Sequence, residues 1–124
     1  MHGVGLQTHL GYFYGLEPDL RETIARFASL GVEVNLSEVD VQTKSFEGDP
    51  ATWPERQREV YRDVVGACVD NTACRWVTFW GFTDRYSWID TYFGADDPLL
   101  FDDALQTKPA YLGVLEALRS ATAD

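Results

Sequence analysis

Segments with strand patterns alternate with segments with helix patterns along the chain, and this alternation limits the possible folds more than any other feature. The six segments, in the order strand, helix, strand, helix, strand, helix, are 4–9, 18–31, 32–40, 52–69, 75–82 and 109–118. Strands separated by helices pair in parallel through right-handed crossovers. The sequence therefore predicts an α/β fold with a parallel sheet.

The length of the chain limits how far such a sheet can extend. With 124 residues, the chain forms at most one domain and is long enough to bury a core. A closed (β/α)8 barrel needs about 250 residues. If the three strand–helix units belong to a barrel, we expect them to form only part of it.

The charge balance disfavours several kinds of partner. Ten lysines and arginines against twenty aspartates and glutamates give a net charge of −10, which repels nucleic-acid phosphates and anionic lipids. No apolar run approaches the roughly 20 residues of a membrane helix. The first residues also lack the basic and apolar regions of a signal peptide. We expect no nucleic-acid partner, no membrane partner and no signal peptide in this sequence.

The two cysteines, Cys68 and Cys74, are too far apart for a CxxC motif, so a thioredoxin-type or zinc-binding function has little support. A disulfide between them would indicate an oxidising compartment. Two buried free thiols fit the sequence equally well.

The second strand pattern ends in two acidic residues. Val32, Val34 and Leu36 alternate with polar residues, and Glu38 and Asp40 continue the same phase. We therefore expect both carboxylates to point to the same face as the apolar residues. They lie at the C-terminal end of the strand, where barrels and open α/β sheets place their sites. A solvated strand end is the alternative interpretation.

His9 ends the first strand, close enough to Glu38 across a βαβ unit for a hydrogen bond. A carboxylate held by an imidazole suits a nucleophile or a base. A core histidine with satisfied hydrogen bonds is equally consistent with the sequence. His2 is the only other histidine, so we expect no metal site, and we expect no cofactor.

Two tryptophans are candidates for binding a sugar. Trp80 and Trp88 flank Asp84 in the stretch 80–88. Aromatic faces stack on sugar rings, and carboxylates accept hydrogen bonds from sugar hydroxyls. A pair of core tryptophans is the alternative, although the polar surroundings of Trp88 fit it less well.

We expect a long loop from 83 to about 107. Its aspartates lack the calcium-binding pattern of an EF-hand, and we interpret them as turn residues. They include Asp96, Asp97, Asp102 and Asp103. The sequence has no GxSxG, P-loop or GxGxxG motif, so serine hydrolase and nucleotide-binding functions lack support.

Four motifs occur in order along the chain. They are Gly-Val-Gly-Leu-Gln-Thr-His-Leu at 3–10, Val-Asn-Leu-Ser-Glu-Val-Asp-Val at 34–41, Trp-Gly-Phe-Thr-Asp-Arg-Tyr-Ser-Trp at 80–88, and Pro-Leu-Leu-Phe-Asp at 98–102 with Lys-Pro-Ala-Tyr at 108–111. Together they resemble the C-terminal part of family 10 glycoside hydrolases, the retaining endo-1,4-β-xylanases. The resemblance implies that residues 1–124 are the C-terminal portion of a (β/α)8 barrel and supply its sixth to eighth strands.

The resemblance also implies roles for individual residues. Glu38 matches the catalytic nucleophile, His9 the histidine that hydrogen-bonds it, and Asp40 the acid that holds that histidine. Gln7 matches the glutamine of the same Gln-x-His motif, near the site. Ser37 stands where the family usually has threonine, which is a conservative change.

Four further residues match the family pattern. Trp80 and Trp88 match the tryptophans that line the sugar subsite at the scissile bond. Cys68 and Cys74 match a cysteine pair that often forms a disulfide in the family. The resemblance implies an extracellular location.

One part of the family's machinery is missing from the sequence. Retaining hydrolysis needs two carboxyl groups about 5–5.5 Å apart. The family's acid/base glutamate lies in an Asn-Glu motif on the fourth strand, and no Asn-Glu dipeptide occurs here. We therefore expect a fragment, from a truncated reading frame or a late internal start, that lacks the N-terminal half of the barrel. The expected function is cleavage of xylan by double displacement, with the isolated chain inactive.

Two other functions fit the same residues. A non-catalytic module would bind sugar through Trp80 and Trp88 and pair with a separate N-terminal half. A related retaining β-1,4-glucanase would use the same site on another polysaccharide. In each case, open sheet edges predict self-association or loose packing of the isolated chain.

Overall fold

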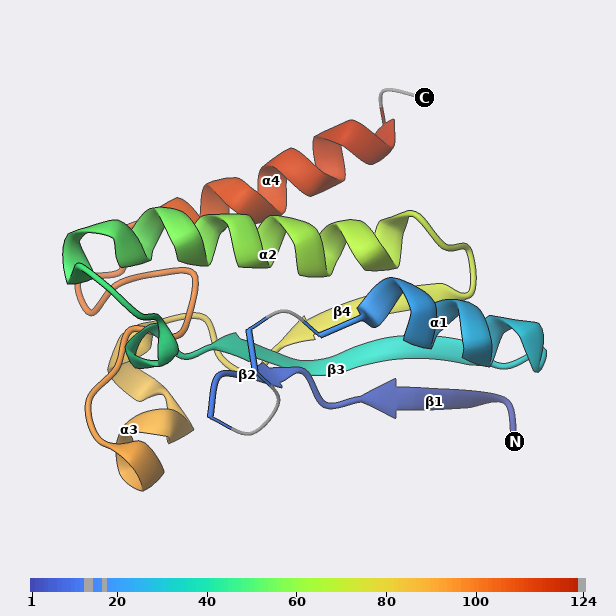
Figure 1. The fold of residues 1–124 in the computed structure, drawn as a ribbon, viewed down its shortest axis with the longest axis horizontal. Helices are drawn as coiled ribbons and strands as arrows, with labels where there is room; N and C mark the ends of the chain where they lie inside the picture. The colour runs from blue at the N-terminus through green and yellow to red at the C-terminus, as the bar shows by residue number, and fades with distance from the viewer. Residues whose placement is uncertain (13–14, 17, 123–124) are drawn as a thin grey trace.

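The computed structural model describes residues 1–12, 15–16 and 18–122, and its centre is a sheet of four parallel strands. The strands are β1 (Gly3–Leu6), β2 (His9–Leu10), β3 (Glu33–Val41) and β4 (Cys74–Phe79). β3 lies in the middle, with β1 and β2 on one side and β4 on the other (Figure 1). Each unit adds its strand on the same side of the sheet, which is the strand order of a (β/α) barrel. The predicted parallel sheet is confirmed.

The sheet is open in the described part of the chain. β1, β2 and β4 each pair with β3 and with no other named strand there. The predicted first strand, 4–9, is divided into β1 and β2, and Gln7 and Thr8 lie between them. This division matters for the site because it places His9 in register with Asp40.

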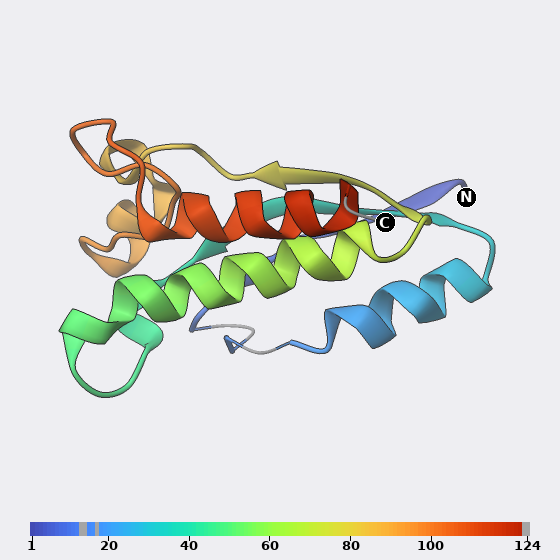
Figure 2. The ribbon, with the colours of Figure 1, turned by 90° about the horizontal axis from the view of Figure 1, so that it is seen from above.

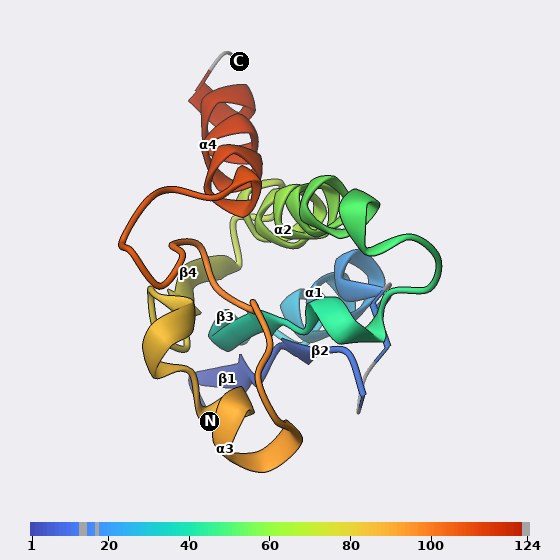
Figure 3. The same cartoon turned by 90° about the vertical axis from the view of Figure 1, so that its left-hand side faces the viewer.

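Three helices lie on the same side of the sheet, and all three were expected from the helix patterns. They are α1 (Leu20–Ser29), α2 (Trp53–Val69) and α4 (Pro109–Thr122). α1 and α2 lie against the sheet, and α4 runs beside α2 (Figures 2 and 3). Within the described ranges, no helix combines the length and the apolar character that a membrane crossing requires.

Gly113 allows α4 to pack closely on α2. A Cβ at this position would collide with the backbone carbonyl oxygen of Arg58. Ala110, Val114 and Ala117 of α4 are buried in the core cluster that α2 and the sheet share. The closeness of the two helices therefore depends on a residue without a side chain.

The predicted loop from 83 to 107 is wrong in part, because it contains the short helix α3 (Trp88–Phe93) after a 3-10 turn, η3 (Asp84–Tyr86). The Ser87 hydroxyl caps α3 by accepting a hydrogen bond from the Ile89 backbone N–H. A six-residue helix is too short to show a hydrophobic period in the sequence. α3 lies at the end of the sheet where the strands terminate (Figure 1). Two further 3-10 turns, η1 (Thr43–Ser45) and η2 (Pro50–Thr52), connect β3 to α2.

The predicted phase of β3 is also wrong. The four core residues of this strand are fully buried: Val34, Leu36, Val39 and Val41. The register with β4 shifts between Leu36 and Val39, so the inward phase moves by one residue. Glu38 and Asp40 therefore point away from the helix-covered face instead of continuing the apolar stripe.

Cys68 and Cys74 form a disulfide, with a Cα–Cα distance of 5.1 Å. The bridge connects the end of α2 to the first residue of β4. This confirms the pairing that the family resemblance implied. The two elements are thus joined covalently as well as through the core.

Candidate active site

The site is built where β1 gives way to β2 and where β3 approaches its C-terminal end. Gln7 lies between β1 and β2, and His9 is the first residue of β2. The shift in β3 directs Glu38 and Asp40 to the sheet face that α2 and α4 do not cover. The structure therefore brings together four residues that the sequence singled out.

Both carboxylate oxygens of Glu38 are held. Gln7 Nε2 donates a hydrogen bond of 3.1 Å to Oε1. His9 Nε2 lies 2.9 Å from Oε2. The Glu38 side chain is still 22% exposed. Its carboxylate is consequently fixed in orientation yet open to an incoming molecule.

His9 bridges two carboxylates. Its Nδ1 lies 3.0 Å from Asp40 Oδ1, while its Nε2 faces Glu38. A neutral imidazole carries only one N–H. The two contacts together therefore require a proton on each ring nitrogen or on one of the carboxyl groups. The histidine therefore links two acids, and both of its ring nitrogens have partners.

Asp40 is the buried end of this chain of contacts, with no exposed surface. Burial raises the pKa of its carboxyl above the ordinary value, and the hydrogen bonds from Trp88 and His9 oppose this rise. Trp88 Nε1 donates to Asp40 Oδ2 at 2.8 Å. The interpretation of Glu38 and Asp40 as a solvated strand end is therefore wrong for Asp40.

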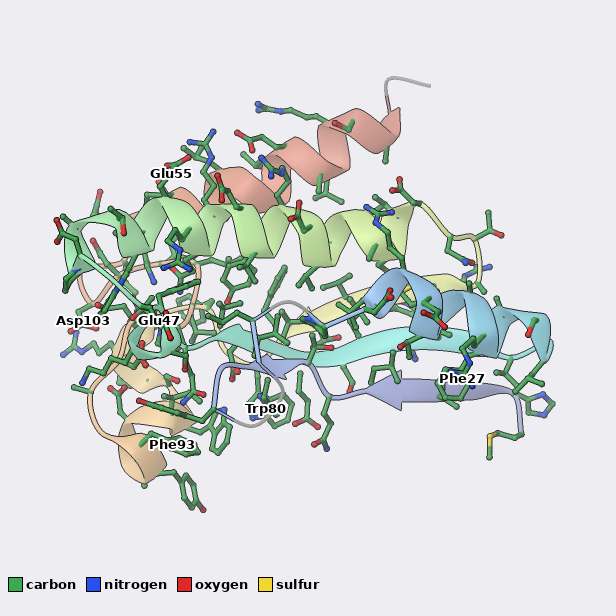
Figure 4. All side chains as sticks on the ribbon, in the orientation of Figure 1. Phe27, Glu47, Glu55, Trp80, Phe93 and Asp103 are labelled. Carbon is green, nitrogen blue, oxygen red and sulfur yellow. A yellow bond between two sulfur atoms is a disulfide. The ribbon has the colours of Figure 1, made fainter. Side chains whose placement is uncertain are left out.

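The two candidate tryptophans occupy different environments. Trp88 begins α3, and its ring meets the edge of the His9 ring at a centroid distance of 5.0 Å. Trp80 follows β4, is 47% exposed, and is tied to the site through its backbone, whose N–H donates to the Val39 carbonyl. Its side chain lies on the sheet side away from α2 and α4 (Figure 4). Trp80 thus offers an aromatic surface, whereas Trp88 supports the acids.

Asp84 has a different role from the one its position between the tryptophans suggested. Its side chain is 2% exposed and pairs with Lys108 Nζ at 2.8 Å. Its Oδ1 accepts a hydrogen bond of 2.7 Å from the Leu99 backbone N–H. Burial raises the pKa of this carboxyl to about 6, although Lys108 and Leu99 oppose the rise. A carboxylate occupied in this way is not available to a sugar hydroxyl.

Among the other loop aspartates, Asp102 holds a local turn, whereas the buried Asp96 joins the loop to the 3-10 turn η1. Asp102 Oδ1 accepts from the N–H groups of Ala104 and Gln106. Asp96 Oδ1 accepts from the N–H and hydroxyl of Thr43. Among the residues that the structure describes, no group of three or more His, Cys, Asp or Glu could hold a metal ion.

Sequence reasoning did not anticipate the part that Lys108 plays. Lys108 belongs to the Lys-Pro-Ala-Tyr motif, and its side chain is nearly buried and ion-paired. Its partner Asp84 lies near the opposite end of the 83–107 segment in the sequence, and no local pattern connects the two residues. A lone lysine just before a helix that begins with proline was the only available signal.

Three strand–helix units with a carboxylate–histidine–carboxylate chain at the strand ends are the architecture of a piece of a (β/α)8 barrel, which places its sites there. Residues 1–117 match the sequence model of Glycosyl hydrolase family 10, and the chain belongs to that family. The match covers all the elements that build the site.

Relatives and solved structures agree with this assignment. The chain is 44% identical to Endo-1,4-beta-xylanase A of Humicola insolens, over 98% of the chain and 32% of that protein. It is 35% identical to Endo-1,4-beta-xylanase B of Thermotoga neapolitana, over 94% of the chain and 34% of that protein. Xylanase 10B of Thermotoga maritima superposes with a TM-score of 0.82 at 32% identity, over 99% of the chain and 38% of that structure.

The chain therefore spans about a third of the length of the curated relatives that it matches. A further solved relative is xylanase 10B of Thermotoga petrophila RKU-1 in complex with xylobiose, at 33% identity and a TM-score of 0.79. It is covered over 36% of its length by 95% of this chain. The partial (β/α)8-barrel fold expected from the sequence is confirmed.

Proposed function

We propose that this chain carries the nucleophile half of a retaining endo-1,4-β-xylanase site, with Glu38 as the nucleophile. The observation that carries the proposal is the fixation of both Glu38 oxygens, by Gln7 and by His9, on a side chain that remains open. A nucleophile must approach one carbon from one direction, and holding it in advance removes that orientational cost from the reaction.

In the proposed reaction, Glu38 attacks the anomeric carbon of a xylosyl unit as the glycosidic oxygen leaves. Water then attacks the covalent glycosyl-enzyme and releases the sugar with its original configuration. His9 and Asp40 are positioning residues, because His9 contacts Glu38 and Asp40 holds His9 from the other side. Trp80 supplies an exposed aromatic face on which a sugar ring stacks.

The second carboxyl group comes from outside these 124 residues. Each of the two chemical steps needs an acid or a base close to Glu38. His9 already occupies one oxygen of Glu38, and Asp40 is buried behind it. The remaining part of the barrel is therefore the partner that we propose, and the isolated chain should cleave xylan hardly at all. Losing general acid catalysis costs typically 10²–10⁴-fold in rate.

Xylan is the substrate class that the relatives support, since those compared are named endo-1,4-beta-xylanases. One of the solved relatives is a complex with xylobiose. The disulfide between Cys68 and Cys74 supports export to an oxidising compartment, where such bonds persist.

The test is the release of dinitrophenolate from dinitrophenyl β-xylobioside by the purified chain. This leaving group needs no protonation, so the missing acid does not prevent the first step. We expect a burst that approaches one equivalent, followed by slow turnover, because the second step lacks its base. Glu38→Gln should abolish the burst, whereas Glu33→Gln, an exposed glutamate at the start of the same strand, should retain it.

Three outcomes would change the proposal. A folded chain that gives no burst would contradict Glu38 as the nucleophile. A faster burst with the corresponding cellobioside would favour a β-1,4-glucanase. Rapid release of reducing sugar from xylan would mean that this chain finds its acid within itself or in a second copy.

A non-catalytic sugar-binding module is the second candidate, and the exposure of Trp80 favours it. Such a module would bind insoluble xylan equally well after Glu38→Ala and would lose binding after Trp80→Ala. It would give no dinitrophenolate burst. Xylan binding by Glu38→Ala and Trp80→Ala, together with the presence or absence of the burst, therefore distinguishes the two functions.

A further inference from the structure

Lys108 immediately precedes α4. Its ammonium group donates all three of its N–H groups to partners inside the protein. Nζ lies 2.8 Å from Asp84 Oδ2, and it donates to the backbone carbonyls of Asp97 and Leu99, both at 2.7 Å. The side chain is 12% exposed. A lysine enclosed in this way is part of the architecture of the loop, since a surface lysine would leave its donors to water.

One of these contacts leads to the indole of Trp88. Asp84 opens η3, and its backbone carbonyl accepts from the Ser87 N–H. Ser87 then caps α3, in which Trp88 is the first residue. By fixing the Asp84 carboxylate, Lys108 therefore fixes the short path from η3 into α3 that carries Trp88.

The other two contacts lead to Asp40. The carbonyls that Lys108 holds belong to the residues on either side of Pro98, and the Pro98 carbonyl accepts from the Val41 N–H at 3.1 Å. Gln57 Nε2 donates to the carbonyls of both Val41 and Asp97. The backbone directly after Asp40 is thus clamped by the segment that Lys108 holds.

We propose that Lys108 and Asp84 are positioning residues that set the hydrogen bond between Trp88 and Asp40, and through Asp40 the orientation of His9 and Glu38. The Lys108 ammonium group influences both partners of this hydrogen bond. It acts on Trp88 through η3 and α3, and on Asp40 through residues 97–99. The two routes are also joined directly, since Asp84 Oδ1 accepts a hydrogen bond from the Leu99 backbone N–H. The proposed consequence for activity rests on the proposed function, whereas the geometry does not.

The experiment follows the indole N–H resonance of Trp88 in the ¹⁵N-labelled chain, identified by its loss in Trp88→Phe. Lys108→Met should displace or broaden this resonance and should slow the dinitrophenolate burst about tenfold, because a small misplacement of reacting groups is costly. Asp84→Asn combined with Lys108→Met should have the same effect without leaving an unpaired buried charge. Arg21→Met removes an exposed ion pair far from the site and should change neither signal.

The outcomes separate this inference from the proposed function. A displaced Trp88 resonance without any burst in the unaltered chain would uphold the positioning role and contradict the nucleophile. A folded double variant whose Trp88 resonance stays in place would overturn the positioning role. Loss of folding in both the single and the double variant would also overturn it, since it would show that the pair maintains the fold as a whole. Restoration of the resonance by Lys108→Arg would support the requirement for a cation.

Discussion

The indole nitrogen of Trp88 lies 2.8 Å from Oδ2 of Asp40, a carboxylate with no exposed surface. The sequence pointed to both residues, but it assigned one to sugar binding and the other to catalysis. In the structure they form a single unit, in which the aromatic ring also meets the edge of His9. A change in the tryptophan should therefore affect the acid.

Replacing Trp88 by Phe keeps an aromatic ring and removes the donor. We expect the free energy of unfolding to fall by about 1–3 kcal/mol, because a buried acceptor is left without a partner. We also expect the pKa of Asp40 to rise further, since one of the hydrogen bonds that opposes its rise is gone. Denaturant unfolding and a carboxyl NMR titration measure the two effects.

The matched control is Trp80→Phe. Trp80 is 47% exposed and is tied to Val39 through its backbone. Its replacement should leave the pKa of Asp40 unchanged. Equal shifts in the two variants would show that the hydrogen bond from Trp88 has no special influence on this acid.

Asp84 should make stability depend on pH in an unusual direction. Burial raises the pKa of its carboxyl from 3.8 to about 6. Between these values, the folded chain keeps a proton that the unfolded chain has released, so the free energy of unfolding falls as the pH rises. The fall that Asp84 contributes is about 3 kcal/mol and is complete above the pKa of the folded state.

Denaturant unfolding of the unaltered chain and of Asp84→Asn across this pH range isolates the effect from the other carboxyl groups. We expect the unaltered chain to lose stability relative to the variant as the pH rises from about 4 to about 6. Parallel pH profiles would show that Asp84 has an ordinary pKa in the folded chain.

The disulfide closes a short loop between α2 and β4. Its removal should lower the free energy of unfolding only modestly. In the chain-entropy model, a loop of this size contributes about 2 kcal/mol. The double replacement Cys68→Ala with Cys74→Ala should lower the free energy of unfolding by that amount, and a reducing agent should have a similar effect on the unaltered chain. A reducing agent that also destabilised the alanine variant would point to a cause other than the disulfide.

Gly113 and Gly66 offer a matched pair of helix glycines. Gly113→Ala places a methyl group against the Arg58 carbonyl oxygen and should separate α4 from α2, with a loss of about 1–3 kcal/mol from overpacking. Gly66→Ala meets only the far end of the Arg21 side chain and should be neutral or stabilising by up to about 1 kcal/mol. Thermal unfolding measures the stability of both variants. Similar changes in stability for Gly113→Ala and Gly66→Ala would contradict the close contact of α2 with α4.

The strand and helix patterns predicted the order of elements because each long element has its own hydrophobic period. Residues 32–36 show a clear alternation, and α2 is long enough for its buried stripe to repeat. The pattern failed at α3, which has only six residues, and at the shift within β3. A shift of one residue leaves the composition of a strand unchanged, so the sequence could not show that Glu38 leaves the apolar face.

The members of the site could be named from the sequence, but the contacts among them could not. His9 and Glu38 were expected to meet because the two strands are neighbours. The contact between Lys108 and Asp84 joins two positions across an irregular segment, and such a contact follows from the path of the backbone. The same reason explains why the sequence did not predict the hydrogen bond from the Trp88 indole N–H to Asp40.

The most direct test of Glu38 as the nucleophile is to locate the covalent sugar. After incubation with dinitrophenyl β-xylobioside, the chain should gain the mass of one xylobiosyl group, and digestion with trypsin should place that mass on the peptide 27–44. Fragmentation of this peptide should assign the sugar to Glu38. A sugar on Glu33 or Asp40, or a folded chain that gains no mass, would contradict the role proposed for Glu38.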